Sequence, residues 1–243
     1  MNRIGHSRMD ATLHDGPTGL PRRLLRHLIV SQGIGVGSRV LDAGCGSGEL
    51  TGYLSLLGID ATGLDSSPAA IAAARRAVPN LDFHLTRSEQ DVPPPDRPFD
   101  LVIVRELTLY RESLASREAF RTTARLLSGL RPGGTLSFLT QTGAAQQSSA
   151  HTTACYRRHL SGFPGAAACV LFRDGLLQQF SPEWLSRRRS PAGHLVITIQ
   201  TPSPAVEQRE WLRYAESAAA THRQPCCGRG HQTDAAIVRA RAA

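Results

Sequence analysis

The stretch from Val40 to Gly48, VLDAGCGSG, constrains the fold more than any other part of the chain. A short apolar run ends in Asp42, three glycines follow at alternate positions, and an amphipathic helix is predicted over 49–57. This order is typical of a buried strand, a tight loop and a helix. Glycines let a ligand approach the main chain, and the first N–H groups of the helix point toward it. The predicted ligand-binding residues here are Asp42, Gly44, Cys45, Gly46 and Gly48.

A second acidic residue, Asp65, ends the next predicted strand, 60–64, and Ser66 follows it. Asp65 comes 17 residues after Gly48. An acid at the end of the second strand of a doubly wound sheet is placed to bind the two hydroxyls of a ribose. Asp65 and Ser66 therefore join the predicted site.

The glycine loop and Asp65 together resemble the class I methyltransferases, which use S-adenosylmethionine. The resemblance implies that the loop cradles the methionine part of this cofactor and that Asp65 holds the ribose. The competing interpretation is an NAD-binding dehydrogenase, whose motif is G-x-G-x-x-G. Here the glycines run G-x-G-x-G, and Asp42 would repel a pyrophosphate and attract an ammonium group. We therefore favour the methyltransferase.

The rest of the chain fits an α/β fold, a doubly wound, Rossmann-like sheet of seven mostly parallel strands. Helix and strand patterns alternate, and the predicted strand 99–104 holds the continuous apolar run 101–104, as in a sheet that is covered on both faces. The predicted strands are 39–42, 60–64, 82–85, 99–104, 135–140, 195–200 and 235–240. The predicted helices are 21–30, 49–57, 68–78, 116–130, 152–160, 181–189 and 206–221. The resemblance implies that the last strand is antiparallel and lies between the fifth and the sixth.

We predict a single domain over residues 1–243, in which the resemblance is clear over about 36–142. Its core is expected at 36–142 and 181–243. The segment 143–180 is interpreted as an insertion on the substrate side, with a hairpin whose turn lies at Asp174-Gly175.

Two further parts of the predicted site follow the third and fourth strands. In the resembling family an acid after the third strand often contacts the adenine amino group, and here Ser88 or Glu89 occupies that region. Ser88 brings no charge, which departs from the common pattern. Arg105 and Glu106 follow the fourth strand, where ligands of open α/β sheets bind, so Arg105 is expected to border the cofactor.

No catalytic residue is assigned. Methyl transfer from a sulfonium mainly needs an aligned acceptor, and a general base is needed only when the acceptor is protonated. The candidates for such a base are Glu106, His151 and His159, and Tyr110 is a candidate to line the pocket.

The acceptor is predicted to be a small molecule. An Asn/Asp-Pro-Pro-Tyr motif after the fourth strand would mark methylation of amino groups of DNA bases or glutamine, but Arg105-Glu106-Leu107-Thr108 stands there. Two alternatives stay open. One is an RNA or protein methyltransferase that uses the arginine-rich later part, although we do not expect a nucleic acid partner. The other is a non-catalytic domain that only binds the cofactor.

Composition sets further bounds. The 243 residues contain no lysine and carry a net charge of +8, and residues 151–243 hold 12 arginines against 6 acids. We interpret this excess as a solvated surface in preference to a site for an anionic substrate. The five cysteines show no disulfide framework, and Cys226-Cys227 with His231 is interpreted as free thiols and one histidine, so no metal is expected. No secretory or membrane-spanning segment is recognised, and a cytoplasmic location is expected.

Overall fold

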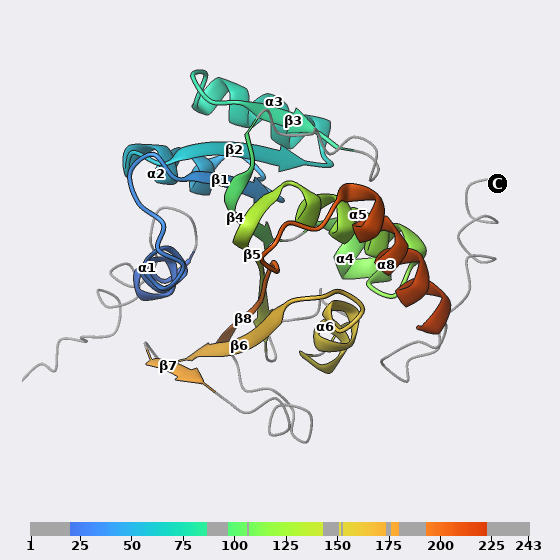
Figure 1. The fold of residues 1–243 in the computed structure, drawn as a ribbon. Helices are drawn as coiled ribbons and strands as arrows, with labels where there is room; N and C mark the ends of the chain where they lie inside the picture. Colours follow the sequence, from blue (N-terminus) through green and yellow to red (C-terminus); the bar gives the residue numbers. More distant parts are fainter. Residues whose placement is uncertain are drawn as a thin grey trace, which may run out of the picture.

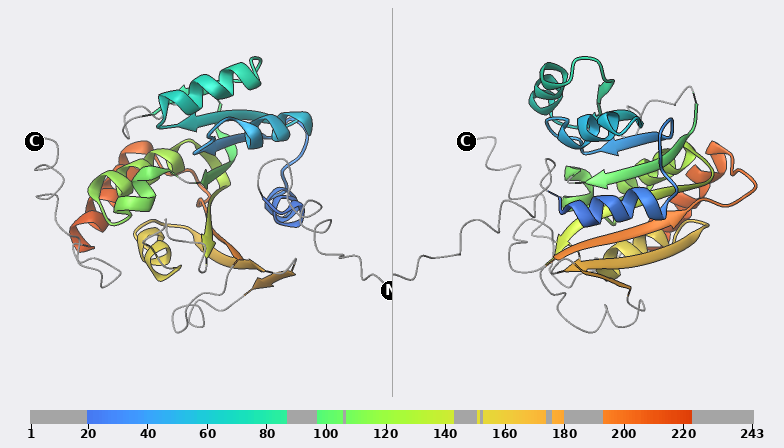
Figure 2. Two further views of the ribbon diagram at one scale, coloured as in Figure 1. Left: turned by 180° about the vertical axis from the view of Figure 1, so that it is seen from behind. Right: turned by 90° about the vertical axis from the view of Figure 1, so that its left-hand side faces the viewer.

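A computed structural model gives the fold of the chain and describes residues 20–86, 97–105, 107–142, 151, 153–173, 176–179 and 193–222. One sheet runs through the molecule, with strands in the order β3-β2-β1-β4-β5-β8-β6-β7. Helices α4, α5, α6 and α8 lie on one side of this sheet and α1 lies on the other, while α3 packs at the β2–β3 end (Figures 1 and 2).

The first five strands pair with one another in parallel, and β6, β7 and β8 join the sheet by antiparallel pairing. The strands are β1 Arg39–Ala43, β2 Asp60–Asp65, β3 Phe83–Leu85, β4 Phe99–Arg105, β5 Leu130–Thr142, β6 Ala166–Arg173, β7 Leu176–Gln179 and β8 Gly193–Gln200. The helices are α1 Arg22–Ser31, α2 Glu49–Leu56, α3 Pro68–Ala77, α4 Thr108–Ser113, α5 Arg117–Ser128, α6 Thr153–Leu160 and α8 Gln208–Thr221.

The predicted fold class is confirmed, with a different assignment of the last strands. An antiparallel strand does lie beside the fifth, but it is β8, which was predicted as the sixth strand. The seventh predicted strand, 235–240, falls outside the described residues. The predicted hairpin is present as β6 and β7, and it extends the central sheet at its β8 edge. The division into a core and a substrate-side insertion at 143–180 stays a prediction.

Helix starts follow the local sequence. The Ser67 hydroxyl accepts the N–H of Ala70, and Pro68 occupies the first helical position of α3. The Ser116 hydroxyl caps α5 in the same way. The helix predicted over 49–57 ends one residue earlier, at Leu56, and Leu57 beyond its end is 41% exposed. The helix predicted over 181–189 falls outside the described residues.

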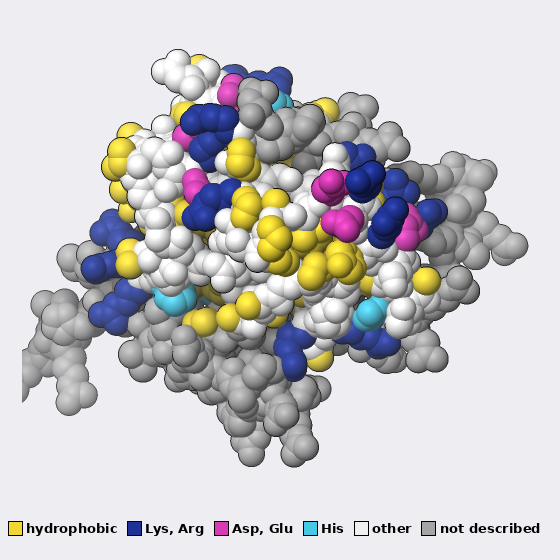
Figure 3. Space-filling view, viewed as in Figure 1, with side chains coloured by type: hydrophobic (Ala, Val, Ile, Leu, Met, Phe, Trp, Pro, Cys, Tyr) yellow, Lys and Arg dark blue, Asp and Glu magenta, His cyan; other side chains and the backbone are white. Residues whose placement is uncertain are grey.

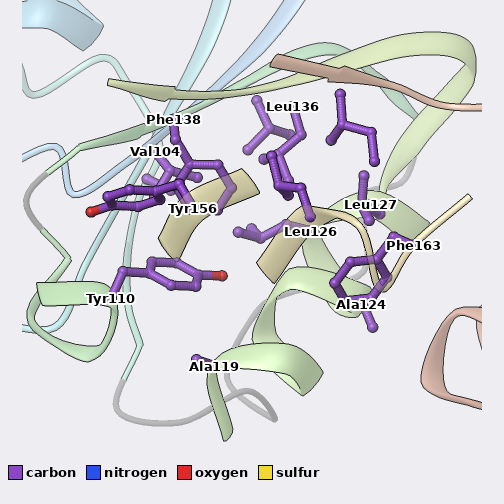
Figure 4. Packing of buried hydrophobic residues seen from close by; sticks show 14 of the residues in the cluster. Val104, Tyr110, Ala119, Ala124, Leu126, Leu127, Leu136, Phe138, Tyr156 and Phe163 are labelled. Carbon is purple, nitrogen blue, oxygen red and sulfur yellow. The ribbon is translucent and has the colours of Figure 1, made fainter. Parts of the chain in front are cut away.

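The core consists of two main layers, one on each side of the sheet. Successive residues of a strand point to opposite faces, so Val40 packs with the α1 and α2 side chains and Leu41 packs on the other side. The larger layer lies between the sheet and helices α4, α5, α6 and α8, and Figure 4 shows its packing around Phe138 and Tyr156. Leu101 and Val102 alternate in the same manner. The apolar centre of β4, residues 101–104, is thereby buried from both sides.

A chain of buried polar side chains crosses the larger layer. The Tyr110 hydroxyl from α4 lies 2.9 Å from Thr123 Oγ1 of α5. Thr123 Oγ1 in turn lies 2.7 Å from His159 Nε2 of α6. His159 Nδ1 lies 2.8 Å from the carbonyl oxygen of Leu114, and its ring stacks on Phe120. This chain joins three helices through hydrogen bonds that water does not reach, since Tyr110, Thr123 and His159 are each at most 2% exposed.

Counting protons along this chain assigns the state of His159. A carbonyl can only accept, so Nδ1 carries the proton that is donated to Leu114. A neutral ring then leaves Nε2 as an acceptor for the single hydroxyl proton of Thr123. The carbonyl oxygen of Ala119, 2.9 Å from Thr123 Oγ1, is a second acceptor for that proton, and Oγ1 can itself accept from Tyr110. Burial lowers the pKa of His159 to about 3. The imidazole is therefore uncharged near neutral pH.

The buried imidazole makes stability depend on pH. The folded-state pKa of about 3 lies below the ordinary value of 6.5, so the unfolded chain binds more protons between these two values. The contribution to stability is complete above pH 6.5 and is lost as the pH falls below it. We expect the free energy of unfolding to fall by about 1–2 kcal/mol from pH 6.5 to 5, measured by urea unfolding.

His159→Gln should remove this component of the pH dependence, whereas His222→Gln, which changes a partly exposed histidine, should keep it. Equal slopes for His159→Gln and the unmodified chain over this range would contradict the assignment.

Candidate functional site

The strand register brings the predicted site together at the carboxyl edge of the parallel strands. Ala43 lies opposite Leu64 on β2 and opposite Val104 on β4. The next residue of each strand is Asp65 on one side and Arg105 on the other, so these two residues flank the start of the glycine loop. Open α/β sheets bind their ligands at this edge.

On the β2 side, hydrogen bonds hold the loop in place. The N–H groups of Gly44 and Cys45 both donate to the carbonyl of Leu64, at 2.7 and 3.0 Å. The N–H of Gly46 donates to Asp65 Oδ2 at 2.9 Å, and the N–H of Ser67 donates to Oδ1 at 2.8 Å. Asp65 therefore shapes the loop and also remains half-buried at its rim.

The three loop glycines are each required for a different reason, although all have positive φ angles. A Cβ on Gly44 would lie 1.5 Å from the carbonyl oxygen of Arg105, so the main chain of the loop packs directly against the end of β4. A Cβ on Gly48 would lie 2.8 Å from the Phe83 ring. A Cβ on Gly46 would meet nothing within 4 Å. The main chain of Gly46 thus faces open space that a ligand can occupy.

Asp42 occupies a different position from the one expected of a ligand contact. Its side chain is fully buried beneath the loop. Thr51 of α2 donates its hydroxyl to Oδ2 at 2.9 Å, and Arg105 Nε lies 3.7 Å from Oδ1. Burial raises the pKa of Asp42, and both Arg105 and Thr51 oppose this rise. Direct contact between Asp42 and the cofactor stays a prediction.

The described residues fit the adenosyl cofactor that the sequence implies. Each oxygen of Asp65 accepts one backbone N–H and keeps a second lone pair, which suits ribose hydroxyls. Ser66 is exposed beside it. The first turn of α2, which begins at Glu49 directly after the loop, contributes N–H groups and the positive end of its dipole.

The remaining predicted residues divide into three groups. Cys45 is a small buried residue of the loop, and burial raises the pKa of its thiol to about 12, so it stays protonated. Ser88, Glu89 and Glu106 fall outside the described residues. Tyr110 and His159 lie in the core, where their polar groups bond to one another through Thr123, and His151 is half-buried with Nε2 3.4 Å from the N–H of Leu114. Proton transfer by Tyr110 or His159 would require this packing to open.

Sequence reasoning missed Thr51. It is the third residue of α2 and is fully buried, next to Leu50 and one turn before Leu54. A hydroxyl on the inward face of an amphipathic helix was the available signal, because a buried hydroxyl needs a hydrogen-bond partner. Asp42 is that partner.

Two negative findings apply to the described ranges alone. Their histidine, cysteine and acidic side chains form no cluster suited to a metal ion. Among the helices that the structure describes, none combines the length and apolar character of a membrane span.

Comparisons with known proteins concern the family and the fold. Residues 40–134 match the family model described as "Methyltransferase domain". A malonyl-[acyl-carrier protein] O-methyltransferase of Enterobacter lignolyticus is 36% identical over 103 residues, which are 42% of this chain and 39% of that protein. A ubiquinone biosynthesis O-methyltransferase of Aromatoleum aromaticum is 32% identical over 108 residues, 43% of this chain and 44% of that protein. The chain thus spans about two fifths of the length of these curated relatives.

Among solved structures, the N-methyltransferase NodS from Bradyrhizobium japonicum superposes with a TM-score of 0.52. The sequences are 20% identical, and the superposition covers 74% of this chain and 93% of NodS. At this identity the likeness concerns the fold.

The contact between Gly44 and β4 predicts a position-specific effect of alanine. Gly44→Ala places a methyl group 1.5 Å from the Arg105 carbonyl oxygen and keeps a φ of +90°, so we expect it to reduce the free energy of unfolding by about 2–5 kcal/mol. Gly46→Ala is the matched control, because it adds only the cost of a positive φ, about 1–2 kcal/mol. Urea unfolding of both variants measures the difference, and equal losses would contradict the close approach at Gly44.

Proposed function

We propose, from the match of residues 40–134 to a methyltransferase domain model and the resemblance of the glycine loop and Asp65 to class I methyltransferases, that the protein transfers a methyl group from S-adenosylmethionine to a small-molecule acceptor. One observation carries the proposal: the main chain of Gly46 faces open space, and its N–H donates to the carboxylate of Asp65. Asp65 comes directly after Leu64, which lies opposite Ala43 in the sheet. One part of the site suits the methionine end of the cofactor and the other suits the ribose.

For methyl transfer, the protein mainly has to align the cofactor and the acceptor. When bound, S-adenosylmethionine supplies a methyl group that is attached to a positively charged sulfur. Transfer of the methyl group turns this sulfur into a neutral thioether, which is the leaving group. Asp65 orients the ribose, the loop and the start of α2 hold the methionine end, and the end of β4 at Arg105 borders the acceptor side. In-line alignment of this kind can contribute about 7–11 kcal/mol to lowering the barrier.

A small-molecule acceptor fits the described surface better than a polymer does. A nucleic acid would need a continuous basic strip. Over α5 and α8, three arginines instead pair with acids: Arg117 and Arg121 with Glu216, and Arg209 with Glu207. Figure 3 shows blue and magenta side chains interleaved on this face. The two curated relatives, by their names, act in malonyl-carrier and ubiquinone chemistry.

Two measurements with the full chain test the proposal. Isothermal calorimetry with S-adenosylhomocysteine should show binding, and NAD and ATP at the same concentration should show none. Incubation with methyl-deuterated S-adenosylmethionine and a panel of phenols, carboxylic acids and amines should give a labelled product by mass spectrometry. Binding of NAD or ATP alone would overturn the proposal, and cofactor binding without any labelled product would favour the non-catalytic alternative.

Asp65 should carry a large share of the cofactor affinity. Asp65→Ala removes the charged acceptor for the ribose hydroxyls, so we expect the affinity for S-adenosylhomocysteine to fall by about 1–3 kcal/mol, which is about 5- to 150-fold in Kd. Asp60→Ala is the matched control, because Asp60 lies at the other end of β2 and pairs with Arg39.

Thermal unfolding of both variants separates a loss of binding from a loss of folding, since Asp65 also accepts two backbone N–H groups. An unchanged Kd for a folded Asp65→Ala would remove Asp65 from the site.

A further inference from the structure

The glycine loop is held from two sides, and the side facing β4 depends on a buried charge. On the β2 side, the backbone of Leu64 and the carboxylate of Asp65 accept the N–H groups of the loop. On the β4 side, the main chain of Gly44 rests on the carbonyl of Arg105. Beneath that contact lies the carboxylate of Asp42, which has no exposed surface.

The carboxylate of Asp42 is reached from two other elements. Thr51, in the first turn of α2, donates to Oδ2 at 2.9 Å. Arg105, the last residue of β4, brings Nε to 3.7 Å from Oδ1, which is too long for a hydrogen bond. Among the described residues neither Oδ1 nor this Nε has a hydrogen-bond partner. Among the described residues, Thr51 therefore donates to the Asp42 side chain, through its hydroxyl at 2.9 Å and with a smaller contribution from its backbone N–H.

Thr51 and Asp42 together span the loop. Asp42 is the residue before the last of β1, and Thr51 is the third residue after Gly48. Their hydrogen bond joins the two ends of the segment 43–50 beneath the ligand-facing side. Both side chains are fully buried in this conformation.

We propose that Thr51 and Arg105 are positioning residues for cofactor binding, which act by holding the buried Asp42 carboxylate in its charged form and so keep the glycine loop in its binding shape. The inference rests on the proposed function, because the loop is taken to bind S-adenosylmethionine. It also revises the expected role of Arg105. In this proposal Arg105 supports the loop through Asp42 and does not contact the cofactor directly.

The charges around Asp42 support this role. Arg105 on β4 and Thr51 on α2 favour the carboxylate, whereas burial and the charge of Asp65 on β2 disfavour it. The Cys45 thiol, the remaining titratable neighbour, is uncharged near neutral pH because burial raises its pKa to about 12. Loss of either supporting partner leaves a buried carboxylate that is more easily protonated.

Calorimetry with S-adenosylhomocysteine on the full chain tests the proposal through Thr51. Thr51→Val keeps the shape and removes the donor, so Kd should rise about tenfold. Thr51→Ser restores the hydroxyl, and Kd should return to within about threefold of the unmodified protein. Thr122→Val is the matched control, because the buried hydroxyl of Thr122 has no hydrogen-bond partner among the described residues. Its Kd should not change.

Arg105→Met provides a second, independent measurement that holds even if Thr51→Val does not fold. A positioning role predicts that the Kd of Arg105→Met for S-adenosylhomocysteine rises as the pH falls from 8.5 to 6.5. The Kd of the unmodified protein should not change over this range. A direct contact predicts a weaker Kd that does not change with pH over this range, and that result overturns the proposal. Arg97→Met, which alters an exposed arginine that pairs with Asp60, should behave as the unmodified protein.

The outcomes separate this inference from the function on which it rests. If the unmodified protein binds no S-adenosylhomocysteine, the proposed function fails and the inference fails with it. If the unmodified protein binds and Thr51→Val binds equally well at every pH, the inference alone is overturned.

Discussion

The close approach of Gly44 to the end of β4 is the constraint on which the site depends. A Cβ at Gly44 would lie 1.5 Å from the carbonyl oxygen of Arg105, so the loop can pass this point only without a side chain. The same passage aligns the ends of three parallel strands. Asp65 and Arg105 thereby come to either side of one short segment, and α2 begins directly after it.

The two acids of the site have different tasks because they differ in exposure. Asp65 is half-buried, accepts two backbone N–H groups and has lone pairs left for a ligand. Asp42 is fully buried. Among the described residues, Thr51 and Arg105 are the two that favour its charged form. A carboxylate without solvent is stabilised only by such partners. Binding and support are thus divided between neighbouring strands.

The later part of the chain completes the sheet with a different pairing pattern. The strands from β3 to β5 are parallel, and β8 then runs antiparallel between β5 and β6. Helix α6 is joined to α4 and α5 by the hydrogen bonds of His159, Thr123 and Tyr110. Because α4 directly follows the end of β4, this buried chain links the later part of the molecule to the edge where the site lies.

The local sequence was enough for the elements that carry their own signals. The loop glycines, the Ser67 cap before Pro68 and the apolar run of β4 predicted a doubly wound sheet and placed Asp65 at its ligand edge, because these features act within a few residues.

Only the tertiary structure decided which strand stands beside β5, and that Asp42 lies beneath the loop with Thr51 and Arg105. It also decided that Tyr110 and His159 belong to the core. Strand order and the burial of a polar group depend on contacts between residues far apart in the chain, and periodicity and propensity along one segment do not encode such contacts.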